Sequence, residues 1–163
     1  MLKIAIKYRP KYVCIVPEKR KEITTEGGLN LKSNTKFLKT IIYRLKKNNI
    51  RVSLFIEPKV SDVKLSKRLG AKCIELHTGK FCDLLNNKKE TKIAFLNLKK
   101  SASYAHEIGL EVHAGHGLTY QSASQITKIK YISEFNIGHF IVSESLFIGL
   151  KKTIKIFKRV INK

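Results

Sequence analysis

The sequence contains no tryptophan, one methionine, three prolines and three cysteines among 163 residues. The cysteines are Cys14, Cys73 and Cys82, an odd number without CxxC spacing. This pattern argues against a disulfide framework and a cysteine zinc site, and it predicts reduced thiols in the cytoplasm. Long apolar runs are also absent, because lysines interrupt every candidate for a membrane span. Residues 1–11 lack the apolar segment of a secretory signal, so we expect no membrane partner.

Acidic residues are scarce, with 12 Asp and Glu against 33 Lys and Arg and a net charge of +21. Such an excess often indicates nucleic acid as a partner. However, 27 of the basic residues are lysines spread along the chain, whereas specific nucleic-acid binding relies more on arginine. Abundant Lys, Asn and Ile without Trp is what mutational drift toward A+T produces. We favour drift over a nucleic-acid surface, and we expect the positive field to attract phosphorylated small molecules.

Length and composition indicate one globular domain. A chain of 163 residues can bury a core but is short for two domains. The 43% hydrophobic and 28% charged content is typical of soluble proteins rather than disordered or fibrous ones. We therefore expect residues 1–163 to form a single domain.

Short apolar runs rich in β-branched residues alternate with segments of helical period. Strands are expected at 12–16, 51–56, 71–77, 110–115 and 134–142, and helices at 34–49, 61–70, 90–109, 120–129 and 145–161. In the second helix, Ser61 is the expected N-cap and Gly70 the C-cap. The absence of hairpin signals predicts βαβ units and a parallel sheet. Neither GxGxxG nor GxxxxGK[ST] follows a strand, which favours a barrel over a doubly wound sheet.

Unusual residues follow most of the expected strands, and the carboxyl ends of parallel strands converge on one edge. They comprise the loop 17–28, Glu57, Glu75 and His77, Thr78 and Gly79, His113 and His116, and Gly138 and His139. Each has a plain alternative, since a histidine can be a hydrogen-bonded structural residue and a glycine can serve a positive φ. Their joint position is what predicts a site.

His116 stands between Gly115 and Gly117 at this edge. An imidazole there can act as a general acid or base near neutral pH. Barrels often hold phosphate in the loops after their last two strands, which here are the loops around 114–119 and 136–139. A metal site of His113, His116 and Glu75 is a weaker alternative, because residue 113 lies near the rim and residue 116 in a turn. We therefore expect no metal.

Five stretches together resemble a known family. They are VPEKRKEITTEGGLN (16–30), RVSLFIE (51–57), IELHTG (74–79), AGHGLTY (114–120) and NIGH (136–139). In this order they resemble the pyridoxine 5′-phosphate synthases, cofactor-free (β/α)8 TIM-barrel transferases of vitamin B6 biosynthesis. The resemblance implies condensation of 1-deoxyxylulose 5-phosphate with 3-amino-2-oxopropyl phosphate, giving pyridoxine 5′-phosphate, inorganic phosphate and water. It also implies a homo-oligomer.

The resemblance assigns roles to individual residues. It implies that His116 is the catalytic proton donor and that Glu75 stabilises charged intermediates. The residues implied to contact substrate or phosphate are Thr24, Gly117, Gly138 and His139.

The chain also departs from the family pattern. Family members begin with a strand carrying Asn-x-Asp-His, followed by a His-x-Arg segment and a Met-adjacent glutamate, and none of these is present. We therefore expect about five of the eight β/α units of such a barrel, with two unpaired edges and an apolar interior open to water. His113 stands where the family usually has Asn, and Ser143 where it often has Gly.

Three hypotheses follow from this pattern. The chain can be a partial synthase that acts with a separate N-terminal fragment or within a longer gene product. It can be an inactive remnant of that enzyme. It can also be a basic module that binds phosphate or nucleic acid.

Overall fold

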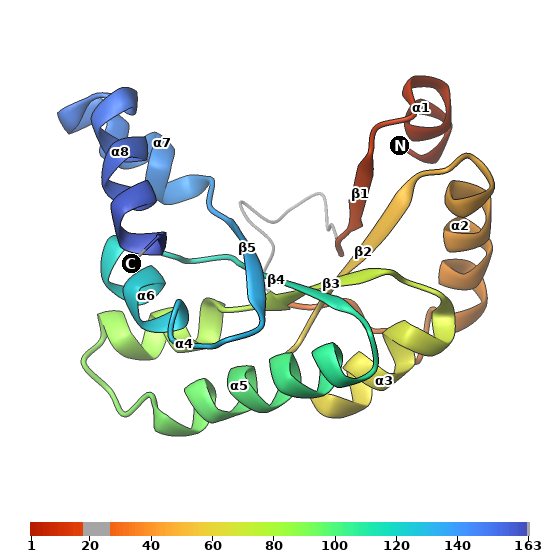
Figure 1. Cartoon of the computed structure of the whole chain (residues 1–163), viewed down its shortest axis with the longest axis horizontal. Coiled ribbons are helices and arrows are strands. Elements are labelled where there is room, and N and C mark those ends of the chain that lie inside the picture. The colour runs from red at the N-terminus through yellow and green to blue at the C-terminus, as the bar shows by residue number, and fades with distance from the viewer. Residues whose placement is uncertain (18–26, 163) are drawn as a thin grey trace.

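The computed structural model describes residues 1–17 and 27–162. All five strands lie in one sheet in the order of the sequence, and each neighbouring pair is parallel. They are β1 (Tyr12–Ile15), β2 (Arg51–Ile56), β3 (Cys73–His77), β4 (Glu111–Gly115) and β5 (Ile132–Asn136). Sequential parallel order is that of successive strands in a (β/α)8 barrel wall. The sheet is curved, and β1 and β5, at its two ends, do not pair with each other within the described ranges (Figure 1).

Helices connect the strands, as expected for βαβ units. They are α1 (Leu2–Tyr8), α2 (Thr35–Lys47), α3 (Val60–Leu69), α4 (Gly79–Asn86), α5 (Lys92–Glu107), α6 (Tyr120–Ile126), α7 (His139–Ile148) and α8 (Leu150–Ile161). Helices α2, α3 and α5 lie along the convex side of the sheet (Figure 1). None of the helices described combines the length and the apolar composition that crossing a bilayer requires. The sequence did not predict α1 and α4.

Two expected elements near the C-terminus were wrong. The strand expected at 134–142 ends at Asn136, and α7 begins at His139. Its apolar run is helical yet contains no buried residue, so neither period nor burial distinguished it from a strand. The single helix expected at 145–161 is the end of α7 followed by α8, separated at Gly149 with φ 83°.

The caps of α3 were half correct. Gly70 ends the helix with φ 92°, the left-handed conformation that glycine adopts without a Cβ penalty. The N-cap, however, is Lys59 and not Ser61, and it makes no side-chain capping bond. The extended backbone of Lys59 places the first helical residue at Val60.

The apolar core lies between the sheet and the convex-side helices. Side chains alternate along each strand, so one set from β2, β3 and β4 faces the helices. The buried members of this set are Val52, Leu54, Ile56, Ile74, Leu76, Val112 and Ala114. They belong to one cluster with residues from α2, α3 and α5, including Leu38, Ile42, Val63, Leu98 and Ala102.

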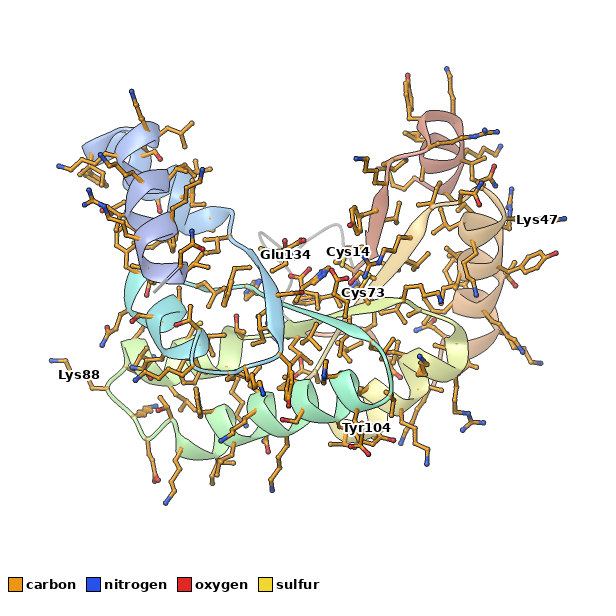
Figure 2. All side chains as sticks on the ribbon, in the orientation of Figure 1. Cys14, Lys47, Cys73, Lys88, Tyr104 and Glu134 are labelled. Atoms are coloured by element: carbon orange, nitrogen blue, oxygen red, sulfur yellow. The ribbon has the colours of Figure 1, made fainter. Side chains whose placement is uncertain are left out.

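The concave face is mixed rather than wholly apolar, because buried polar side chains stand there beside Phe55 and Cys73. Its residues include Ser53, Glu75, His77 and His113, all buried. Figure 2 shows Cys14, Cys73 and Glu134 on the concave side, with Lys47, Lys88 and Tyr104 directed outward. The three cysteines are free thiols. Alternation with the outward apolar set places these polar side chains inward.

Candidate active site

A cavity of about 810 Å³ lies at the carboxyl end of the sheet. Its lining includes five of the six residues predicted for the site, namely Glu75, His116, Gly117, Gly138 and His139. These residues come from β3, the turn after β4 and the start of α7. The sixth, Thr24, lies outside the described residues. The fold thus brings together a carboxylate, two imidazoles and two glycines from distant parts of the chain.

Glu75 lies near the middle of β3 and is only 8% exposed. Its Oε2 accepts a hydrogen bond from Asn136 Nδ2 at 2.7 Å and from the Cys14 thiol at 3.5 Å. Burial raises the pKa of the Glu75 carboxyl, although the bonds from Asn136 and Cys14 oppose that shift. A carboxyl in this setting can keep its proton at higher pH than an exposed glutamate.

Asn136 and Cys14 were not predicted as site residues. Both reach Glu75 from positions 61 residues away in the sequence. Burial and the nearby Glu75 carboxyl raise the pKa of Cys14 to about 12, so its thiol stays protonated and donates to the carboxylate. The signal available in the sequence was their place in the strand pattern, because Asn136 ends β5 in the NIGH stretch.

Gly115 makes room for the Glu75 carboxylate. It pairs with His77 on β3 and with Asn136 on β5. A side chain at this position would collide with Glu75 Oε1 and would lie 3.1 Å from Asn136 Cβ. Gly115, the first glycine of AGHG, is therefore required because a Cβ there would clash with Glu75. Gly117 is required for a different reason, since its backbone adopts φ 74° in the turn.

His116 follows β4 with φ 83°, a conformation that few residues other than glycine adopt. Its side chain is half-buried and lines the main cavity. Burial, followed by the nearby His77 and His139, lowers the pKa of His116. The free site therefore favours a neutral imidazole, and an anionic phosphate bound beside it would favour the protonated form needed for proton donation.

The start of α7 offers a place for an anion. Gly138 is the N-cap of this ten-residue helix and His139 its first residue, and both line the cavity. Among the described residues, apart from those adjoining it in the chain and in its own helix, none has an atom within 4 Å of the position that a Cβ on Gly138 would occupy. Free N–H groups and the helix dipole at such a terminus favour phosphate.

A second cavity, of about 310 Å³, shares His116 with the first. Its other lining residues are Glu57, His77, Gly79, Lys80 and Asp83. The Glu57 carboxylate lies 2.9 Å from His77 Nδ1 and accepts the Gly28 N–H at 2.9 Å. The bond to His77, then that from Gly28, lowers the pKa of Glu57 to about 2 against the opposing effect of burial.

The rings of His77 and His116 lie close together, with centroids 4.9 Å apart. Gly79 permits this approach, since a Cβ on it would lie 2.6 Å from His77 Nε2 and 2.9 Å from His116 Cδ2. The sequence placed Glu57 and His77 at this edge without assigning them a role. The structure makes His77 a direct neighbour of His116 and places Glu57 in the lining of the same cavity.

His113, in the middle of β4, belongs to a different cluster that includes Glu111 at the amino-terminal end of the strand. Its Nε2 lies 2.8 Å from Glu111 Oε1 and its Nδ1 lies 3.8 Å from Glu134 Oε1, while Arg51 pairs with Glu111. In the parts of the chain that the structure describes, Glu111, His113 and Glu134 form the only cluster with metal-ligand spacing. The metal set His113, His116 and Glu75 is therefore not supported.

The arrangement around His113 is that of an ion-pair cluster rather than a cation site. The two ring nitrogens face different carboxylates. The Arg51 guanidinium already forms an ion pair with the Glu111 carboxylate. One ring nitrogen of this buried imidazole is hydrogen-bonded to Glu111, and the other lies within ion-pair distance of Glu134.

Comparison with known sequences identifies a family. The family model described as "Pyridoxal phosphate biosynthesis protein PdxJ" matches residues 1–163. Similar proteins named pyridoxine 5′-phosphate synthase include one from Pelagibacter ubique, 55% identical over 100% of this chain and 68% of its own length. One from Ehrlichia canis is 47% identical over 99% of this chain and 66% of its own length. The chain thus spans about two thirds of the length of the curated relatives it matches.

Comparison with solved structures supports the fold. Citrate synthase SbnG aligns with a TM-score of 0.58 at 12% identity, covering 99% of this chain and 68% of the other. Triosephosphate isomerase from Bartonella henselae aligns with a TM-score of 0.52 at 7% identity, covering 91% and 65%. At these identities the likeness concerns the fold alone, and it confirms the predicted TIM-barrel type, here with five strands.

Proposed function

The chain belongs to the PdxJ family of pyridoxal phosphate biosynthesis proteins, and from this premise we propose that its site carries out pyridoxine 5′-phosphate synthesis. The reaction is condensation of 1-deoxyxylulose 5-phosphate with 3-amino-2-oxopropyl phosphate, releasing phosphate and water. One observation carries the proposal. Five residues that match the family's functional positions come from three separate segments and line one cavity.

The proposed roles follow from the chemistry of each residue. His116 donates a proton to the reacting substrate, because its imidazole can change protonation state near neutral pH. Glu75 stabilises positive charge that develops on an intermediate, from a buried position where such an interaction is weakly screened. Gly138 and His139 bind phosphate at the start of α7, and Gly117 contacts substrate or phosphate from the turn after β4. Thr24 contributes a substrate contact.

The proposal includes more of the barrel than the five strands described. Strands β1 and β5 each have one edge without a partner strand in the described sheet. Parallel strands of a barrel are paired on both edges. Further β/α units of the family, in the same chain or in a separate N-terminal fragment, would close the wall, and residues 1–163 would act as one domain of it.

A complementation assay tests this function. The purified chain would be mixed with the N-terminal third, approximately, of the Pelagibacter ubique relative, the part outside the matched 68%. Formation of pyridoxine 5′-phosphate from both substrates would be followed with the mixture, with each component alone, and with a mixture carrying His116→Gln. We expect product from the unsubstituted mixture only. A stable complex that forms no product at saturating substrates would overturn the proposal.

The same preparation separates the competing hypotheses. An inactive remnant would unfold without a cooperative transition in circular dichroism, whereas a sharp two-state transition counts against it. A basic binding module would hold RNA or DNA with an affinity that falls steeply with salt, and a flat salt dependence excludes that form. We expect the charge of +21 to act on phosphorylated substrates instead.

Two further properties belong to the proposal. The three free thiols support a cytoplasmic location. A homo-oligomer is proposed from the family resemblance, and the exposed apolar side chains Val142, Leu146 and Phe147 of α7 are available for such contacts. Sedimentation of the complemented barrel measures this directly.

A further inference from the structure

The left-handed backbone of His116 has to be held in place by its surroundings. At φ 83° a residue with a bulky side chain is strained, at a cost on the order of 1–3 kcal/mol. Such a conformation persists only where neighbouring groups over-determine it. The turn 115–117 should therefore carry contacts that a relaxed turn does not need.

Those contacts come from the segment that follows β3. The Thr78 hydroxyl lies 2.8 Å from the Gly115 carbonyl oxygen and 2.5 Å from that of His116, so its single proton is shared between two successive carbonyls. The Thr78 backbone N–H also donates to the Gly115 oxygen at 2.9 Å. The Cys82 thiol lies 3.7 Å from the His116 oxygen. Thr78 is 0% exposed, so water does not compete for these bonds.

Thr78 stands at an N-cap position, where a threonine hydroxyl ordinarily caps its own helix. It is the N-cap residue of α4, yet its side chain makes no capping bond to that helix. An N-cap hydroxyl normally accepts a hydrogen bond from a backbone N–H in the first turn. Thr119, the N-cap of α6, does so by accepting from Ser122 N–H in a capping box. The Thr78 hydroxyl is directed away from its own helix and toward the turn after β4.

We propose that Thr78 is a positioning residue for His116, because its buried hydroxyl ties the carbonyls of residues 115 and 116 and so holds the imidazole in the cavity. The positioning stands on the contacts alone, whereas its consequence for the reaction rests on the proposed function. Valine matches threonine in shape but has no hydroxyl, so Thr78→Val removes both bonds and leaves two buried carbonyls with fewer donors.

A conformational readout tests the positioning without the reaction. The imidazole of His116 would be titrated by NMR in the unsubstituted chain and in variants. Within the described ranges, the titratable groups around it are Glu57, Glu75, His77, Lys80, Cys82, Asp83 and His139. In Thr78→Val we expect the ring to lose its fixed, half-buried place, so its resonances shift and its titration midpoint moves up toward the ordinary histidine value.

Two variants serve as controls for this titration. Thr78→Ser keeps the hydroxyl and should leave the His116 titration as it is. Thr153→Val removes another fully buried hydroxyl that donates to a carbonyl, that of Gly149 at 3.1 Å. It should cost similar stability without moving the His116 resonances. Thr78→Ala repeats the test should valine prevent folding.

The kinetic test uses the complemented barrel, which is the mixture of this chain with the N-terminal fragment of the relative described above. Thr78→Val should lower kcat by about ten- to a hundred-fold with little change in KM, since misplacing a catalytic group by about 1 Å costs up to 10²-fold. Thr78→Ser should restore kcat to within a few-fold. If the unsubstituted mixture forms no product, the proposed function fails while the NMR titration still decides the positioning. A His116 titration that is the same in Thr78→Val as in Thr153→Val would overturn the inference.

Discussion

Strand β4 contains one histidine, His113, and is followed by a second, His116, and the two imidazoles lie in different surroundings. Toward the amino-terminal end of β4, the mid-strand His113 lies in a cluster with Arg51, Glu111 and Glu134, and each ring nitrogen faces a carboxylate. Just beyond the carboxyl end of β4, His116 lines two cavities, and burial, followed by the nearby His77 and His139, lowers its pKa. In the first cluster the imidazole contacts two carboxylates of the protein. In the second the imidazole lines two cavities, where a ligand can reach it.

This difference follows the general division of barrels. The carboxyl ends of the strands carry the chemistry, and the opposite ends contribute stability. His113 and His116 stand three residues apart in the sequence, so composition alone does not separate their roles. The surroundings that separate them come from β2, β3 and β5.

The largest expected effect separates the two histidines by activity. In the complemented barrel, His116→Gln should lower the rate of pyridoxine 5′-phosphate formation by about 10²- to 10⁴-fold, the usual contribution of a general acid. His113→Gln should change the rate by no more than a few-fold. Initial rates at saturating substrates measure both. Comparable losses from the two substitutions would contradict the division between the ends of β4.

The second effect concerns Glu75, between the two ends. Glu75→Gln should lower the rate by about 10²- to 10³-fold, the range found when one electrostatic stabiliser is removed. Because burial raises the pKa of Glu75, the folded chain disfavours its charged form. Stability from this group is present below the ordinary glutamate pKa of 4.5 and is lost as the pH rises through the folded value.

Urea unfolding across the acid range checks the sign for Glu75. The variant should gain stability relative to the unsubstituted chain as the pH rises from 4.5. A difference in the opposite direction would mean that Asn136 and Cys14 stabilise the carboxylate more than burial destabilises it.

The third prediction concerns the stability that the cluster around His113 contributes. His113→Leu leaves Glu111 and Glu134 without their shared partner and should cost about 1–3 kcal/mol of unfolding free energy. His113→Asn keeps a donor at this position and should cost less. Equilibrium urea unfolding compares the two variants at constant pH. A leucine variant as stable as the unsubstituted chain would show that the ion pairs contribute no net stability.

The smallest effect concerns Glu57, at the carboxyl end. Its pKa is lowered to about 2 by the bonds from His77 and Gly28. The stability it contributes is present above the ordinary pKa of 4.5 and is lost as the pH falls from 4.5 toward 2. Because the side chain is 32% exposed, we expect Glu57→Gln to cost no more than about 1 kcal/mol at neutral pH. The difference should vanish near pH 2, and a constant difference down to that pH would contradict the assignment.

Sequence patterns predicted the central elements well. The strand at 51–56 has the predicted bounds, and the helix expected at 34–49 is α2, at Thr35–Lys47. Both segments bury one clear set of apolar residues, so the spacing of apolar residues in the sequence corresponds to the face that is buried in the structure. Prediction failed at 134–142, where an apolar run forms a helix that buries nothing.

Some of the residues that line the main cavity were predicted from the sequence, whereas their roles stay predictions. Local motifs identified Glu75, His116, Gly117, Gly138 and His139, and the fold brings them to one cavity. The partners of these residues were missed, because Cys14 and Asn136 meet Glu75 only through strand pairing. Thr78 was named only among the residues that follow the third expected strand, since nothing local indicates that its hydroxyl points away from its own helix.

By itself the sequence determined the alternation of strands and helices, the turns that end them and the residue types available for chemistry. These properties depend on near neighbours, through hydrophobic period and glycine conformation. Only the tertiary structure decided that His113 bonds to Glu111, that His116 lines two cavities, that the absence of a Cβ on Gly115 leaves room for Glu75, and that the Thr78 hydroxyl bonds to the carbonyls of the turn 115–117. Those outcomes depend on burial and on contacts between distant strands, which shift pKa values and direct hydrogen bonds.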